Sequence, residues 1–254
     1  MSKKNALVTG AEHGIGKAIA IDLAKNGYNV GVNYFNSKEK AKDTCKQIEQ
    51  LGPKALLLQA DITDNQQLDA MFTSFSQTFG SIDLMVNNAG VSKFYPFLEV
   101  TEDQWKEITF ADWKGAFFCT QYAAKNMIEH QKNGVVINIS SNHVDGCWPT
   151  ATIYASAKAA LTKFGKNAAM ELAPYGIRVV TVAPGYTDVG WEAGHPAYGT
   201  LDKLPFKRFC QPEEIAKIVT FLSSEACSYM TGNCVTVDGG ALLAIVPENT
   251  ILED

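Results

Sequence analysis

A tyrosine and a lysine four residues apart, Tyr154 and Lys158, are the side chains in this sequence best suited to proton transfer. On a helix, residues i and i+4 share one face, so the ammonium can approach the phenol. A free phenol keeps its proton up to pH ~10, and a nearby cation favours the phenolate. Tyr154 could then take a proton from an alcohol or give one to a carbonyl. Many such pairs only line a helix face, but Ser141, at the end of the preceding predicted strand, could hold the substrate oxygen.

A glycine-rich turn, Thr9-Gly10-Ala11-Glu12-His13-Gly14-Ile15-Gly16, follows the apolar run 6–8 and leads into a helical pattern. Backbone N–H groups at a helix start lack partners, and the helix dipole adds positive charge there, which favours a diphosphate. Glycine permits both the tight turn and the close approach of phosphates. The spacing is G-x-x-x-G-x-G, not G-x-G-x-x-G, and by itself it also fits an ordinary turn.

Small or polar residues also follow four other predicted strands. They are Asp61 with Ile62, Asn87 to Gly90, Ser140 with Ser141, and Pro184 with Gly185. In an open parallel sheet, ligands bind beyond the carboxyl ends of the strands. We therefore expect these residues to line one crevice, although loops are commonly polar.

Apolar runs and helical patterns alternate along the whole chain. Strands are expected at 6–8, 29–35, 55–59, 82–87, 134–139, 177–182 and 233–237. Helices are expected from Ile15, over 38–51, after a cap at Thr63 or Asp64, over 102–130 with a break near Gly115, over 153–173, and from Pro212. This alternation predicts the α/β class: a Rossmann-type doubly wound parallel sheet of about seven strands with helices on both faces, in one domain, 1–254.

The composition of the chain bears on its binding partners and on its location in the cell. The net charge of -5 gives no basic face for nucleic acid, and no apolar run is long enough for a membrane span. The first strand lies too near the N-terminus for a secretory signal. Six scattered cysteines show neither a C-x-x-C motif nor a His grouping. We expect reduced thiols, a cytoplasmic protein and no metal site.

With these residues in place, the chain resembles the short-chain dehydrogenase/reductase family over nearly its whole length. The motifs stand in family order: Thr9 to Gly16, Asp61, Asn87-Asn88-Ala89-Gly90, Ser141, Tyr154 with Lys158, Pro184-Gly185, and Val237-Asp238-Gly239-Gly240. The resemblance implies hydride transfer between a nicotinamide cofactor and an alcohol or carbonyl.

The same resemblance implies roles for individual residues. Tyr154 would be the acid/base, Ser141 would orient the substrate oxygen, and Lys158 would favour the ionised phenol and bond the nicotinamide ribose. The residues expected to contact the dinucleotide are Thr9, Gly10, His13, Gly14, Ile15, Gly16, Asn33, Ser37, Lys38, Asp61, Ile62, Asn88, Ala89, Gly90, Tyr154, Lys158, Pro184, Gly185 and Thr187.

One position departs from the family pattern. Family members usually have an asparagine in the long helix before the fifth strand, where it supports a water-linked proton relay. Alignment of residues 113–117 with the family pattern puts Asp112 at that place. The aspartate could add a charge near Lys158 and alter the relay, or only supply the same backbone carbonyl. We count Asp112 among the catalytic residues and expect activity to survive, because the family role depends partly on main-chain geometry.

The cofactor preference depends on the end of the second strand. A carboxylate there would accept hydrogen bonds from the adenosine 2′-hydroxyl and repel a 2′-phosphate. The place falls near Tyr34 and holds no acid, and Asn33, Ser37 and Lys38 could receive a phosphate. Against this, Glu12 lies in the glycine loop, where NADP-using relatives often carry a basic residue. Lys38 also suits a solvated helix start. The balance favours NADP(H) over NAD(H).

Segment 187–209 lies where the family has its mobile substrate lid. His143, Glu192 and His195 could bond several hydroxyl groups, which favours a sugar or polyol over an apolar ketone. The stretch 140–143, with Trp148-Pro149 after it, also resembles glucose dehydrogenases of this family. The residues expected at the substrate are His143, Trp148, Trp191, Glu192 and His195. They also fit exposed loops, and a 3-oxoacyl thioester or another ketone is the alternative substrate.

Two other classes of function are possible readings of the sequence. A catalytically weak cofactor-binding scaffold or redox sensor is favoured only by Asp112. A nucleotide-sugar epimerase would need a larger C-terminal sugar domain. The family resemblance also suggests a homotetramer joined through the long helices and the C-terminal segment, where the apolar run 241–246 fits burial against a partner or within the chain's own core.

Overall fold

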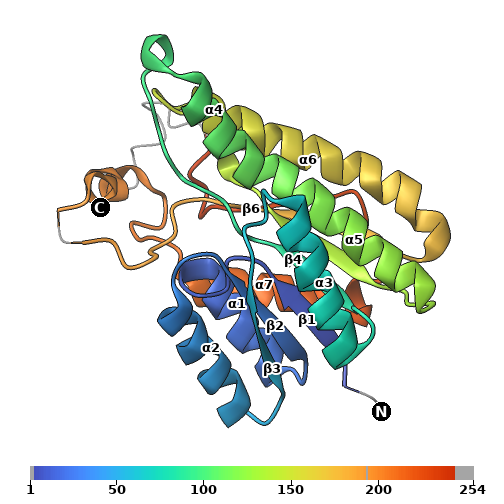
Figure 1. Cartoon of the computed structure of the whole chain (residues 1–254). Helices are drawn as coiled ribbons and strands as arrows, with labels where there is room; N and C mark the ends of the chain where they lie inside the picture. The colour runs from blue at the N-terminus through green and yellow to red at the C-terminus, as the bar shows by residue number, and fades with distance from the viewer. Residues whose placement is uncertain (1–2, 193, 244–254) are drawn as a thin grey trace.

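The structure, a computed structural model, describes residues 3–192 and 194–243 (Figure 1). Seven parallel strands form one sheet in the order β3-β2-β1-β4-β5-β6-β7. Their bounds are β1 Asn5–Val8, β2 Asn29–Tyr34, β3 Ala55–Gln59, β4 Leu84–Asn87, β5 Val135–Ile139, β6 Arg178–Pro184 and β7 Cys234–Val237. The predicted doubly wound parallel sheet is confirmed.

Helices cover both faces of the sheet. Their bounds are α1 Gly14–Lys25, α2 Lys38–Gln50, α3 Asn65–Phe79, α4 Glu102–Thr109, α5 Ala116–Glu129, α6 Thr152–Leu172 and α7 Pro212–Ser223. Successive side chains of a strand point to opposite faces. Ala6 and Val8 accordingly pack in the core with α1, α2 and α7, whereas Leu7 packs in the core with α3, α5 and α6. Burial on both faces explains why the strands read as continuous apolar runs.

The structure refines several expected boundaries. β4 begins at Leu84 rather than at residue 82, because the Ile82 N–H donates to the side chain of Asn126 (2.8 Å) instead of to a strand. Asp64, not Thr63, caps α3 by accepting from two backbone N–H groups. The long helix expected over 102–130 is divided by a π-helical turn at Phe110–Gly115, which ends at the glycine where a break was expected.

The strand order reverses beside β1, which pairs with β2 on one side and β4 on the other. Connections leave in opposite directions at this point, so a crevice opens between the loops at the carboxyl ends of the two strands. This topology places the glycine-rich turn after β1 beside the residues that follow β4.

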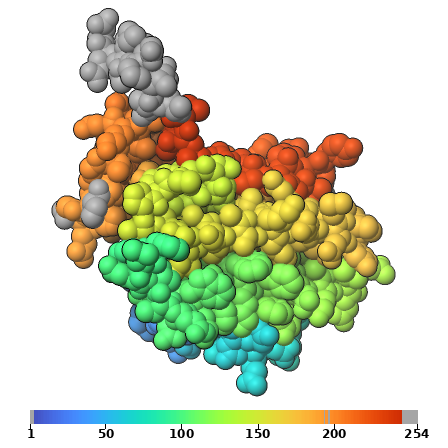
Figure 2. Space-filling model, turned by 90° about the horizontal axis from the view of Figure 1, so that it is seen from above, coloured from blue at the N-terminus to red at the C-terminus, as the bar shows by residue number. Residues whose placement is uncertain are grey.

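The segment expected as a lid, 187–209, stands at one side of the molecule (orange in Figures 1 and 2). It contains a 3-10 helix, Pro196–Lys203, and its own small core of Ala197, Leu204 and Phe209. An isolated β-bridge between Thr187 and Cys210 joins its two ends. The segment is therefore a loop whose two ends are held together by a β-bridge. Its mobility stays a prediction.

Three further expectations from the sequence concern membrane-spanning helices, the cysteines and the apolar run near the C-terminus. No helix in residues 3–192 and 194–243 is both long enough and apolar enough to cross a membrane. All six cysteines lie in the described part and are unpaired. Residues 244–246 of the apolar run 241–246 lie outside the described residues.

Candidate active site

The glycine-rich turn brings the chain before α1 against the end of β4. Gly10 and Gly14 adopt φ angles of +60° and +52°, which side chains disfavour. A Cβ on Gly16 would collide with the carbonyl oxygen of Gly10 and the amide of Asn88. That amide donates to the carbonyl oxygens of residues 9 and 10, both at 3.0 Å. The α1 N-terminus, which has no side-chain cap, thereby faces open space and forms a cradle suited to a diphosphate.

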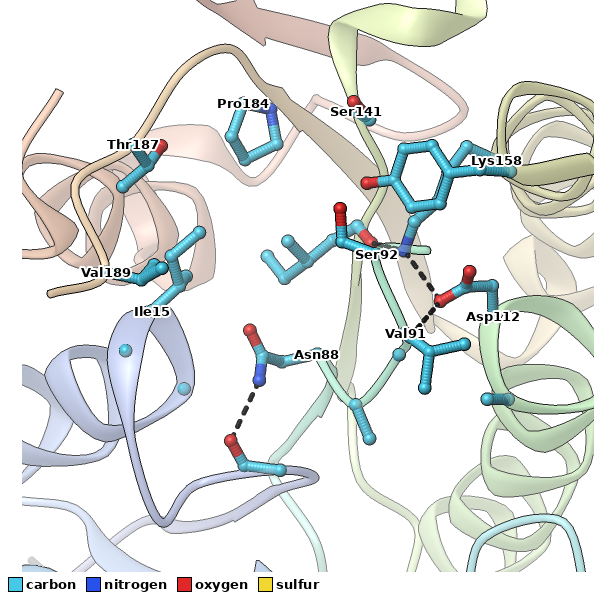
Figure 3. Close-up of a pocket in the computed structure, with 18 of the residues that line it drawn as sticks. Ile15, Asn88, Val91, Ser92, Asp112, Ser141, Lys158, Pro184, Thr187 and Val189 are labelled. Carbon is cyan, nitrogen blue, oxygen red and sulfur yellow. Dashed lines mark hydrogen bonds and ion pairs between the residues drawn. The ribbon is translucent and has the colours of Figure 1, made fainter. Parts of the chain in front are cut away.

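A cavity of about 960 Å³ extends from this cradle across the carboxyl ends of the strands to segment 187–209. Ile15, Thr187 and Val189 lie on one side of it, and Ser141, Lys158 and Asp112 lie on the other (Figure 3). The predicted cofactor residues that line it are Gly10, His13, Gly14, Ile15, Gly16, Asn33, Asp61, Ile62, Asn88, Ala89, Gly90, Tyr154, Lys158, Pro184, Gly185 and Thr187.

The expected catalytic residues meet in the same cavity. Tyr154 and Lys158 lie on one face of α6, with the Lys158 Nζ 5.6 Å from the centroid of the phenol ring. The ammonium donates to the carbonyl oxygen of Ile139 (3.2 Å), at the end of β5. Ser140, the next residue, donates from its hydroxyl to the Lys158 carbonyl (3.1 Å). These bonds fasten α6 to the strand end that carries Ser141.

Asp112 lies inside the site, in the π-helical turn. Its Oδ1 is 3.4 Å from the Lys158 Nζ and accepts from the Val91 N–H at 3.0 Å (Figure 3). Burial alone would lower the pKa of Lys158, but the Asp112 carboxylate raises it, so the ammonium stays charged. Burial raises the pKa of Asp112, although the positive charge of Lys158 acts to lower it. A Cβ on Gly90 would collide with the Asp112 carboxylate, which explains the glycine at that position. The expected extra charge near Lys158 is present.

His143 belongs to an aromatic cluster around the reacting groups. Its Nδ1 is 3.0 Å from the Ser141 Oγ. Its ring stacks on Trp148 (4.0 Å between centroids) and lies edge-on to Tyr154 (5.2 Å) and near Phe94 (5.9 Å). Burial lowers the pKa of His143 to about 4, so the imidazole is neutral around pH 7. A neutral ring can donate from one nitrogen and accept at the other.

Four predicted contact residues lie outside the cavity lining, and their contacts stay predictions. Thr9 is 1% exposed, and its hydroxyl holds the end of β4 by accepting from the N–H groups of Asn88 and Ala89. Ser37 and Lys38 sit at the start of α2, and neither lines the cavity. Glu192 is an exposed residue of the loop after β6. Trp191 and His195 from that loop do line the cavity, with parallel stacked rings.

The structure adds lining residues that the sequence analysis did not select. Among them are Glu12, Phe35, Ser92, Phe94, Thr150, Tyr186 and Val189. Each lies within a few residues of a predicted strand end or of a selected residue, so proximity to those positions was the available signal. Proximity to a strand end did not distinguish these residues from their neighbours, because the path of each loop decides which side chains face the cavity.

The cradle and the catalytic cluster define an enzyme class, and comparisons with known proteins agree with it. A family model described as enoyl-(acyl carrier protein) reductase matches residues 10–241. The 3-oxoacyl-[acyl-carrier-protein] reductase FabG of Staphylococcus aureus is 38% identical over 242 residues, which are 93% of this chain and 97% of that protein. The crystal structure of acetoin dehydrogenase YohF from Salmonella typhimurium superposes with a TM-score of 0.90 at 35% identity, covering 97% of this chain and 98% of that one.

A further relative, the oxidoreductase YohF of Escherichia coli, is 36% identical over 94% of this chain and 96% of its own length. The chain belongs to the short-chain dehydrogenase/reductase family. It is therefore an oxidoreductase, of a family that uses nicotinamide dinucleotides.

Proposed function

We propose that this chain interconverts an alcohol and a carbonyl with NAD(P)(H). The observation that carries the proposal is that Ser141, Tyr154 and Lys158 line the same cavity as the glycine cradle. The glycines fit a dinucleotide because a Cβ on Gly10 or Gly16 would fill the space that the turn needs. When bound, the nicotinamide supplies or accepts the hydride.

The chain's own residues handle the proton and the substrate oxygen. The Tyr154 hydroxyl exchanges a proton with that oxygen, and the Lys158 ammonium favours the ionised phenol. The Ser141 hydroxyl donates a hydrogen bond to the same oxygen. The Ser141 hydroxyl can donate to the substrate oxygen only if it does not donate to His143. The His143 Nδ1 must therefore be protonated and donate to the Ser141 Oγ, because an unprotonated Nδ1 would accept the hydrogen bond of the serine hydroxyl. His143 thus orients the serine.

For the substrate, we propose a small molecule with a hydroxyl beside the reacting carbon, such as a hydroxyketone, sugar or polyol. His143, Trp148, Trp191 and His195 line the cavity and offer polar atoms on aromatic walls. The structural neighbour named as an acetoin dehydrogenase supports this class, because acetoin carries a hydroxyl beside its carbonyl. A 3-oxoacyl thioester is the second candidate, supported by the FabG relative.

For the nucleotide, the sequence favoured NADP(H) through Ser37 and Lys38. Neither residue lines the cavity, so that support is lost. The Asn33 amide, the third expected phosphate partner, donates to the carbonyl oxygens of Leu58 (3.2 Å) and Ala60 (3.1 Å). We therefore propose NAD(H) as the preferred cofactor.

The test of the proposed function is Tyr154→Phe, measured on hydroxyketones, polyols and 3-oxoacyl thioesters with both cofactors. Loss of the proton donor should reduce turnover about 10²–10⁴-fold while NADH binding, followed by fluorescence, stays unchanged. Tyr175→Phe, at a half-exposed position outside the cavity lining, is the matched control. Wild-type turnover in Tyr154→Phe would refute the assignment. Cofactor binding without turnover on any substrate would favour the scaffold or sensor instead.

We also propose a homotetramer and a cytoplasmic location. Phe110, Trp113 and Phe117 expose more than a third of their surface along the α4–α5 side, where the family resemblance places a subunit contact. A second copy of the chain would cover this apolar surface. The six unpaired cysteines fit a reducing compartment.

A further inference from the structure

After β7 the chain reverses and returns to the wall of the catalytic cavity. The Asp238 carboxylate accepts from the backbone N–H groups of Gly240 (2.9 Å) and Leu242 (3.1 Å). Gly239 and Gly240 adopt left-handed φ angles of +63° and +80°, which permit the tight reversal. These residues, 238–242, form the C-terminal turn, and its hydrogen bonds fix the position of Leu242.

The side chains of Leu242 and Trp148 meet over Gly146, in the loop between β5 and α6. A Cβ on Gly146 would lie 2.5 Å from the Trp148 indole and 2.6 Å from the Leu242 side chain. Because both side chains reach the same point, they are neighbours. Gly146 does not adopt a left-handed φ. The space available, rather than the backbone conformation, therefore requires glycine at this position.

Trp148 connects this contact to the reacting groups. Its indole stacks on the His143 ring, with 4.0 Å between the centroids and 25° between the planes. The His143 Nδ1 is in turn 3.0 Å from the Ser141 Oγ. One hydrogen bond does not fix an imidazole ring, because its second side-chain torsion has broad minima. The stacked indole limits that rotation, so displacement of Trp148 would release the ring that orients the serine.

We propose that the C-terminal turn positions the Ser141 hydroxyl through Trp148 and His143. Gly146 and Leu242 are positioning residues, because neither of them lines the cavity. Their effect on turnover should therefore pass through the indole. The proposal rests on the proposed function, in that the Ser141 hydroxyl must bond the substrate oxygen.

Gly146→Ala tests the packing without removing a side chain. The added methyl group should push the Trp148 indole away from the His143 ring. Turnover of hydroxyketones, polyols and 3-oxoacyl thioesters should fall about 10–10²-fold, as expected for a displacement of about 1 Å at a reacting group. The dissociation constant for NADH, measured by calorimetry, should stay unchanged, because the glycine cradle is untouched.

Leu242→Ala removes the support from the other side and should also lower turnover. Leu243→Ala is the matched control, because Leu243 is the next residue and is 69% exposed. The control should keep wild-type turnover. Equal turnover in Leu242→Ala and Leu243→Ala would overturn the proposal.

A double-mutant cycle with His143→Ala identifies the route. Without the imidazole ring, Trp148 has no ring to hold, so Gly146→Ala should lower turnover no further in this background. A fall by the same factor in both backgrounds would show that Gly146 acts independently of His143. That result would overturn the proposal, as would wild-type turnover in Gly146→Ala or a fall in its NADH affinity that matches the fall in turnover.

Proton NMR of the histidine rings provides a readout that does not depend on turnover. The indole should shift the ring protons of His143 upfield in the wild type, and Gly146→Ala should reduce that shift. His143→Ala assigns the signals. A wild type without turnover on any substrate would refute the proposed function and the role in catalysis. An unshifted His143 ring in the wild type would refute the packing on which this inference depends.

Discussion

The buried pair of Asp112 and Lys158 sets the electrostatics of the candidate active site. Lys158 is 5% exposed and Asp112 is 1% exposed, so water screens neither charge well. The carboxylate partly offsets the effect of the ammonium on the Tyr154 phenol. Asp112 Oδ2 has no hydrogen-bond partner among the described residues, so the pair is not fully satisfied. Buried pairs of this kind cost desolvation energy and contribute little net stability, which points to a functional role.

Asp112→Asn should shift the pH dependence of alcohol oxidation. The amide can still accept from the Val91 N–H, but it no longer carries the charge that raises the pKa of Lys158. The pKa of Lys158 should therefore fall, and the alkaline limb of the rate profile should move to lower pH as the ammonium is lost. Steady-state rates across pH measure that limb.

Asp69→Asn, at an exposed position of α3, is the control for charge loss alone and should leave the profile unchanged. Asp112→Ala should be about 3–5 kcal/mol less stable to urea, because it leaves the Lys158 charge buried and unpaired. An unshifted alkaline limb in Asp112→Asn would mean that the carboxylate does not hold the charge on Lys158.

At the scale of elements, two irregular stretches of backbone position the site. The π-helical turn Phe110–Gly115 carries Asp112, whose Oδ1 lies 3.4 Å from the Lys158 Nζ. Single π-helical turns inside α-helices often occur at functional sites. The glycine-rich turn brings the α1 N-terminus beside Asn88. Gly16 lets the glycine-rich turn approach the Gly10 carbonyl closely, and Gly90, in the loop after β4, leaves room for the Asp112 carboxylate.

Gly16→Ala should damage the cradle. Its Cβ has no room beside the Gly10 carbonyl and the Asn88 amide, so the turn must shift. We expect a loss of about 1–3 kcal/mol in unfolding free energy, as for other overpacked sites, and a larger fall in NADH affinity than in stability. Denaturant titration and calorimetry measure the two quantities.

Gly199→Ala is the matched control. It lies in the 3-10 helix of segment 187–209, and nothing stands within 4 Å of its added Cβ. The control should keep wild-type stability and affinity. Equal NADH affinity in Gly16→Ala and Gly199→Ala would show that the cradle does not hold the dinucleotide.

At the scale of the whole molecule, the parallel sheet brings residues that are far apart in the sequence together around one cavity. On the α4–α5 side, Phe110, Trp113 and Phe117 form an exposed apolar surface. We expect light scattering to give four times the chain mass of 27.6 kDa. Phe117→Glu, on the exposed part of α5, should yield smaller species because a charge in an apolar contact is costly. Leu51→Glu, at the far end of α2, should leave the mass unchanged. A monomeric wild type would refute the tetramer.

Several features followed from the sequence alone because their causes are local. Apolar runs alternating with helical patterns fixed the strand and helix order, since burial on both faces leaves a readable period. The i, i+4 spacing placed Tyr154 and Lys158 on one helix face, and the family motifs located Asp112 beside them. The tertiary structure decided what depends on distant segments meeting. It left Lys38 outside the cavity lining, placed Glu12 in the cavity wall, and brought the His143 Nδ1 within hydrogen-bond distance of the Ser141 hydroxyl. No local pattern encodes these outcomes, because each depends on where a loop directs a side chain after the sheet has formed.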